Sequence, residues 1–128
     1  HKMGKPIVVF EGGESMRFDE FSITEGIRGI KNVLSHFSML PASQKQNIES
    51  IHLERTKWLR APRAGMFVPS VTNGTYISKG QPLGMVTDTV AKKSREIKAP
   101  LDGVVFCVNH QAVVNQGDAI FHIGSPTL

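Results

Sequence analysis

Hydrophobic and polar positions follow two different periods along the chain, and the change between them divides it. Residues 7–10 (Ile-Val-Val-Phe) form a continuous β-rich apolar run, which is typical of a strand buried on both faces. Further on, apolar residues recur at spacings of four, three, four and three, which predicts one face of a helix over residues 22–39: Ile23, Ile27, Ile30, Leu34 and Phe37. Ser22 and Glu25 match a capping box at the start of this helix, and Pro41 closes it.

A buried strand followed by a strongly apolar helix is half of an α/β unit, and the chain offers no parallel strands that would complete its sheet. Residues 1–48 are therefore interpreted as the C-terminal strand and helix of an incomplete α/β catalytic domain. The polar residues 42–49 are interpreted as the linker that follows it. Apolar side chains that should cover an absent sheet stay in water, and unpaired strand edges invite pairing. We therefore expect either self-association through residues 7–40 or a segment that is loosely ordered against the β domain.

From residue 50 onward the pattern changes to short apolar strands separated by turn signals, which predicts a small β barrel or sandwich over residues 49–128. The pentapeptide Ala-Pro-x-x-Gly occurs twice, at residues 61–65 and 99–103. Each copy leads into an apolar strand, a polar stretch and a second apolar strand. Two copies predict one pseudo-symmetric domain of two intertwined halves, in which proline stops strand pairing at each corner and glycine permits the bend.

Composition narrows the class of protein. With 40% hydrophobic and 20% charged residues among 128, the chain is globular and not disordered. Its apolar runs stay far below the roughly 18 residues that span a membrane, so no membrane partner is expected. The run at residues 7–10 is too short for a signal peptide, and the single Cys107 cannot form an internal disulfide. The protein is therefore predicted to be cytoplasmic, with Cys107 as a buried thiol in a strand.

The net charge of +4 raises the question of nucleic acid. The densest basic stretch, residues 55–63, contains Trp58. In a strand, Arg55 and Lys57 point to one face while Trp58 and Arg60 point to the other, so the charges form no stripe. A nucleic-acid site would cluster them beside several stacking aromatics. Solvated strand edges explain the stretch better, and no nucleic-acid partner is expected.

The β pattern resembles the barrel-sandwich hybrid of lipoyl and biotinyl carrier domains, which it matches in its two "AP..G" corners and in the strands "GQPLGMV" and "GDAIFHI". Those domains present a modifiable lysine at a tight hairpin, within Met-Lys-Met or Asp-Lys-Ala. The matching connection here, residues 88–94, holds Lys92 and Lys93 but neither flanking pattern. Exposed lysines in a polar loop are usually solvated charge. A carrier or adaptor module nevertheless stays open as the alternative function.

A wider resemblance covers about residues 6–124. "IVVFEGGES", "GIRGIKNVLSHFSML", "RAPRAGMFVPSVTNGTYISKGQPLGMVTD" and "IKAPLDGVVFCVNHQAVVNQGDAIFHIG" follow one another as in the C-terminal part of the succinylglutamate desuccinylase/aspartoacylase family. The resemblance implies a main α/β domain like that of zinc carboxypeptidases, with a small β domain appended. It also implies a parent protein that is a zinc-dependent deacylase of an N-acyl amino acid or similar small amide. The β domain would shape access to the active site.

Glu11 is the candidate catalytic residue. Glu11-Gly12-Gly13 matches the family's Glu-x-Gly context, in which the Glu assists the zinc-bound water as general acid/base. Independently of the family, an acid at the carboxyl end of a buried strand, followed by glycines, sits where open α/β sheets place their chemistry. The alternative is that Glu11 only begins a turn beside Glu14, which lacks the matching context.

Metal ligands are not expected in this chain. The family binds zinc through a His-x-x-Glu pair and a later His, all upstream of the Glu. None of the five histidines is followed three residues on by Glu or Asp: His1, His36, His52, His110 and His122. A catalytic zinc generally needs three protein ligands. The chain is therefore interpreted as a C-terminal fragment that binds no zinc and is inactive alone, with zinc in the full-length parent. Its substrate-binding residues are not identified.

Overall fold

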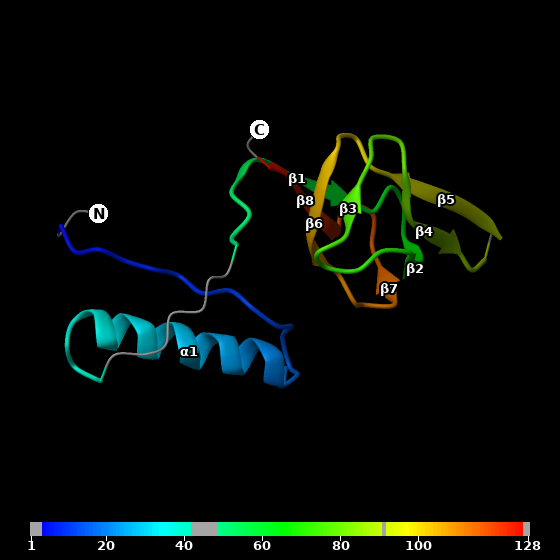
Figure 1. Cartoon of the computed structure of the whole chain (residues 1–128). Coiled ribbons are helices and arrows are strands. Elements are labelled where there is room, and N and C mark those ends of the chain that lie inside the picture. The colour runs from blue at the N-terminus through cyan, green and yellow to red at the C-terminus, as the bar shows by residue number, and fades with distance from the viewer. Residues whose placement is uncertain (1–3, 42–48, 91, 127–128) are drawn as a thin grey trace. The chain divides into compact units, whose positions relative to one another are not determined.

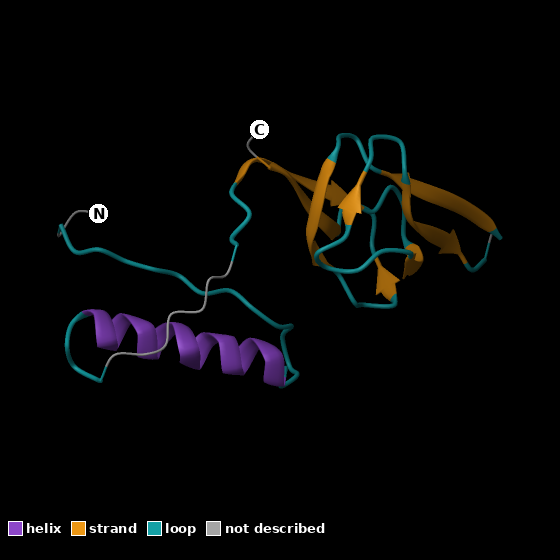
Figure 2. Cartoon of the chain, in the orientation of Figure 1, coloured by secondary structure: helices purple, strands orange, loops and turns teal. Residues whose placement is uncertain are grey.

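The structure is a computed structural model that describes residues 4–41, 49–90 and 92–126, so most of the predicted linker lies outside the described residues. The chain divides into two units, residues 1–48 and residues 49–128. Figure 2 shows the described helix in the first unit and the described strands in the second.

The described residues of the first unit contain one helix, α1, which spans Glu20–His36. It begins two residues earlier than predicted because Asp19 is its N-cap: the carboxylate accepts hydrogen bonds from the amide (3.4 Å) and the hydroxyl (2.5 Å) of Ser22. The predicted capping box is therefore wrong, since Ser22 lies inside the helix and Glu25 pairs with Arg28 instead. The helix also ends three residues early, because Ser38 has a left-handed backbone (φ 58°) that cannot continue it.

The predicted strand over residues 7–10 is not formed in the part of the chain that the structure describes, where these residues pair with no other strand. Their side chains lie in water, with Val8 86% exposed. A strand is held by ladder hydrogen bonds to a partner, and no described residue supplies them. All residues of α1 are described, and none of them is buried. The apolar face that the spacing predicts exists, but none of its residues is buried.

The second unit is a β structure of two antiparallel four-stranded sheets (Figure 1). One sheet has the order β1-β8-β6-β3 and the other β5-β4-β2-β7. The mainly β class is confirmed. The strand bounds are β1 Leu53–Arg60, β2 Gly65–Pro69, β3 Tyr76–Ile77, β4 Pro82–Asp88, β5 Lys93–Lys98, β6 Gly103–Val108, β7 Val113–Val114 and β8 Ala119–Pro126.

The two halves of the β unit are intertwined, as the repeat predicts. The half that begins at the first Ala-Pro-x-x-Gly copy contributes β2 and β4 to one sheet and lends its short strand β3 to the other. The second half contributes β6 and β8 and lends β7 in return. The inner faces of both sheets meet in one core, in which Phe67 of β2 contacts Phe121 of β8 edge to face, 5.3 Å between ring centroids. Because each half completes the other's sheet, neither half can bury its apolar face alone.

The corner pentapeptide recurs because each copy makes the same contacts. The Ala61 carbonyl accepts a hydrogen bond from Gly117 N (2.9 Å), and the Ala61 amide donates to Asp118 O (2.8 Å). In the second copy, the Ala99 carbonyl accepts a hydrogen bond from Gly80 N (2.7 Å), and the Ala99 amide donates to Gln81 O (2.9 Å). At the last position, a Cβ on Gly65 or Gly103 would come closer than 3.0 Å to a backbone carbonyl oxygen of the neighbouring strand. Glycine is required there by a close approach of two backbones.

Cys107 lies in β6 as predicted, but its side chain is only partly buried. The prediction of a buried thiol is wrong because a register irregularity between Val105 and Cys107 interrupts the in-out alternation of β6. In the described part of the chain, no helix has both the length and the apolar character needed to cross a membrane.

Candidate functional site

Glu11 lies in the connection between the extended residues 7–10 and α1, and its side chain is exposed. The sequence places it at the end of a buried strand, whereas the structure places it after an unpaired segment. The glycines that follow it have a local role. A Cβ on Gly12 or on Gly26 of α1 would crowd the Phe10 ring, so both glycines leave room for that ring beside the helix. Gly13 adds a left-handed turn (φ 77°) before α1.

A shallow hollow of about 140 Å³ lies where this connection meets the first turn of α1. Its polar groups already have partners: Glu14 and Arg17 form an ion pair (3.2 Å), and Asp19 caps the helix. The hydrogen bond from the Ser22 hydroxyl, assisted by backbone amides at the helix start, lowers the pKa of Asp19. Glu11 does not line this hollow, which is bounded by Phe10, Gly12, Gly13, Glu14, Arg17, Phe18, Asp19, Ser22 and Ile23.

The histidines are dispersed. His1 lies outside the described residues, and His36 ends α1 against the Phe37 ring (5.2 Å between centroids). His122 of β8 is held between two aromatic rings, Trp58 of β1 (3.9 Å, stacked) and Phe106 of β6 (4.1 Å, tilted). Burial in this stack lowers the pKa of His122. Nowhere in the described residues do three His, Cys, Asp or Glu side chains gather closely enough to hold a metal ion.

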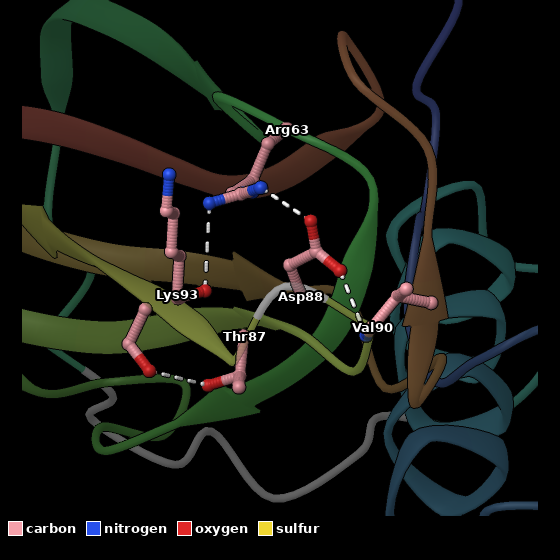
Figure 3. Close-up of polar contacts among 6 residues, drawn as sticks. Arg63, Thr87, Asp88, Val90 and Lys93 are labelled. Atoms are coloured by element: carbon pink, nitrogen blue, oxygen red, sulfur yellow. Dashed lines mark hydrogen bonds and ion pairs between the residues drawn. The ribbon is translucent and has the colours of Figure 1, made fainter.

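Lys92 and Lys93 lie on the hairpin between β4 and β5, as the carrier resemblance predicts. Both side chains are exposed, and Lys92 has a left-handed backbone (φ 51°). Figure 3 shows a polar network at the base of this hairpin, in which the Arg63 guanidinium donates to the Asp88 carboxylate at 2.5 Å. Sequence reasoning missed Arg63. The sequence did carry a signal for it: the third position of the Ala-Pro-x-x-Gly pentapeptide is Arg63 in the first copy but the apolar Leu101 in the second.

No family model matches the sequence, and no curated protein matches it significantly. Several solved structures do match the chain. A succinylglutamate desuccinylase/aspartoacylase from Rhodobacter sphaeroides aligns with 88% of this chain and 37% of its own, at 24% identity and a TM-score of 0.75. The ectoine utilization protein EutE (DoeB) from Ruegeria pomeroyi aligns with 85% of this chain and 36% of its own, at 20% identity and a TM-score of 0.74.

The chain has the fold of a C-terminal part of the succinylglutamate desuccinylase/aspartoacylase proteins. It spans little more than a third of the length of these structures. A weaker likeness covers only part of the chain: a single-chain, multi-domain long-chain acyl-CoA carboxylase aligns with 62% of it and 8% of its own chain, at 23% identity and a TM-score of 0.51.

Proposed function

We propose that the chain is the C-terminal part of a zinc-dependent deacylase, which hydrolyses the amide bond of an N-acyl amino acid or a similar small amide. The observation that carries the proposal is the likeness in fold, over 88% of the chain, to a succinylglutamate desuccinylase/aspartoacylase. In the whole protein the β unit shapes access to the active site. The exchange of β3 and β7 between two pseudo-symmetric halves supports the further assignment of this unit to the barrel-sandwich hybrids.

Glu11 is proposed as the general acid/base of the whole protein. Its carboxylate is exposed, so it is free to reach a substrate site completed by residues outside this chain. A carboxylate in this role takes a proton from the attacking water and returns it to the leaving amine. Glu14, three residues on, is the less suitable acid because it is paired with Arg17.

The described residues do not fit a zinc site, since they contain no group of three possible ligands. Zinc in the whole protein would therefore be held by side chains outside this chain. The isolated chain is accordingly expected to show no hydrolysis and no stoichiometric zinc. One tightly held zinc ion per purified chain would contradict this expectation.

The proposal is tested on the full-length protein, with N-acetylaspartate and N-succinylglutamate as the first substrates. We expect amide hydrolysis that the Glu11→Gln variant loses by a factor of about 10² or more, the usual range for a general acid/base. Glu14→Gln, in the same connection, is the matched control and should retain activity. The proposal fails if the upstream sequence lacks a His-x-x-Glu pair with a further His, or if Glu11→Gln is as active as the parent.

A carrier module is the second candidate. The exposed Lys92 and Lys93 on a tight hairpin, together with the partial likeness to an acyl-CoA carboxylase, favour it. Mass spectrometry of the protein purified from its own host would reveal biotin or lipoate on either lysine. Such a modification, lost in the Lys92→Arg or Lys93→Arg variant, would favour the carrier over the deacylase.

A further inference from the structure

The two halves of the β unit differ at the β4–β5 hairpin. Corners, turns and exchanged short strands occur in both halves, so the fold itself requires them. The outer strand of each sheet is different. β5 follows β4 through a hairpin that projects from the unit (Figure 1), whereas β1 reaches the matching edge from the N-terminal side of both repeats. A feature that only one half carries is not explained by the symmetry of the fold.

Arg63 differs between the halves in the same way. It occupies the third position of the first Ala-Pro-x-x-Gly copy, where the second copy has the partly buried Leu101. Leu101 packs against the core. Arg63 instead reaches from the corner to the hairpin, and joins two segments 25 residues apart.

The contacts of Arg63 hold both sides of the hairpin base. One guanidinium nitrogen donates to Asp88 Oδ2 (2.5 Å), at the end of β4, and another lies 3.5 Å from the Lys93 carbonyl, at the start of β5 (Figure 3). The second oxygen of Asp88 accepts the Val90 amide (2.9 Å) in the tip. The side chains of Arg63 and Asp88 are only 26% and 25% exposed, so water screens this pair less than it screens an ordinary surface pair.

The tip beyond this network needs such support. Lys92 adopts a left-handed backbone, which a residue with a Cβ holds only when its surroundings impose it. Val90 is 92% exposed, so packing does not fix the tip. The pairing of β4 with β5 ends at Asp88 and Lys93, one step beyond the hydroxyl pair of Thr87 and Ser94 (3.0 Å), so Val90 and Lys92 lie outside the strand pairing.

We propose that Arg63 is a positioning residue that clamps the β4–β5 hairpin from the first corner, so that Lys92 and Lys93 are displayed in a single conformation. The clamp is built from one side chain that contacts both strands, and its removal releases the tip while the sheets keep their pairing. The core contains neither Arg63 nor Asp88, which separates the order of the hairpin from the stability of the unit.

The test is the backbone N–H order parameter of the full chain, measured by NMR. In the parent we expect values near 0.85 at Val90 and Lys92, and in Arg63→Gln values of about 0.6 or lower. Val86 and Phe121, in the core, should not change. Asp88→Asn keeps an oxygen for the Val90 amide and removes only the charge, so it should loosen the tip as well. Glu96→Gln is the matched control because it breaks the exposed Glu96–Lys98 pair (3.2 Å) on the same strand.

Arg63→Lys tests the geometry of the clamp. A lysine keeps the charge but has one nitrogen, so it should restore order at Val90 only in part. The proposal is overturned if the parent tip is already mobile, if Arg63→Gln leaves the order parameters unchanged, or if both Arg63→Gln and Asp88→Asn disorder the whole unit. The measurement requires no substrate, so its failure is distinguishable from failure of the hydrolysis assay.

Discussion

At the scale of single residues, Gly103 illustrates how closely the two backbones approach at a corner. A Cβ at this position would lie closer than 3.0 Å to the Gly124 carbonyl oxygen, and backbone cannot move aside as a flexible side chain can. We expect Gly103→Ala to reduce the free energy of unfolding of the β unit by about 1–3 kcal/mol. Chemical denaturation measures this. At Gly29 of α1 an added Cβ would meet nothing within 4 Å, so Gly29→Ala is the contrasting variant and should not destabilise the protein. If Gly103→Ala is as stable as the parent, the close approach of the two backbones is refuted.

His122 gives the second prediction at this scale. Burial between aromatic rings lowers its pKa below 6.5, so the unfolded chain binds this proton more readily than the folded one. The contribution of the neutral imidazole to stability is therefore complete above about pH 6.5 and is lost as the pH falls through the folded pKa. Unfolding measured from about pH 7.5 to about pH 5 should show a steeper loss of stability in the parent than in His122→Gln. Parallel pH profiles would contradict the assignment.

At the scale of elements, α1 depends on its N-cap, because none of its residues is buried. Asp19→Ala removes the acceptor of the Ser22 hydrogen bonds, so circular dichroism should show less helix. Asp19→Asn keeps an acceptor and loses only the favourable charge at the helix start, so it should retain most of the helix. Since the pKa of Asp19 is lowered, its charge stabilises the helix above about pH 3.8, and this contribution is lost as the pH falls through the folded pKa. Equal helix content in Asp19→Ala and the parent would argue against the cap.

At the scale of the whole molecule, the uncovered apolar residues of the first unit predict association between chains. Each large apolar side chain left in water forgoes roughly 1.5–3 kcal/mol relative to full burial. Val8, Ile27 and Ile30 are among those exposed. We propose self-association through residues 7–40, seen by analytical ultracentrifugation as a mass that rises with concentration. Ile30→Lys should weaken it, whereas Lys31→Ala, at the next position, should not.

The β unit provides the control for this experiment. Its core is made entirely of its own residues, so a chain of residues 49–128 should fold and stay monomeric. A strictly monomeric full chain, or a truncated chain that associates as strongly, would refute association through the first unit. Failure of the truncated chain to fold would show that the two units depend on each other.

The sequence alone was sufficient for the features that rest on local chemistry or on repetition. The spacing of Ile23, Ile27 and Ile30 predicted a helix, because a helix presents every third or fourth residue on one face. The two Ala-Pro-x-x-Gly copies predicted two intertwined halves, because equal corners require equal partners. The two copies of this short motif predicted more of the fold than the composition or the net charge did.

Only the tertiary structure decided the features that need a partner distant in the chain. Residues 7–10 have the composition of a strand, but ladder hydrogen bonds come from a neighbouring strand that the described chain does not supply. The stacking of His122 between Trp58 and Phe106 depends on strand register, and the Arg63 clamp depends on a corner meeting a hairpin 25 residues away. Local sequence sets what a segment prefers, while contacts across the sheets determine whether that preference is satisfied and what each side chain meets.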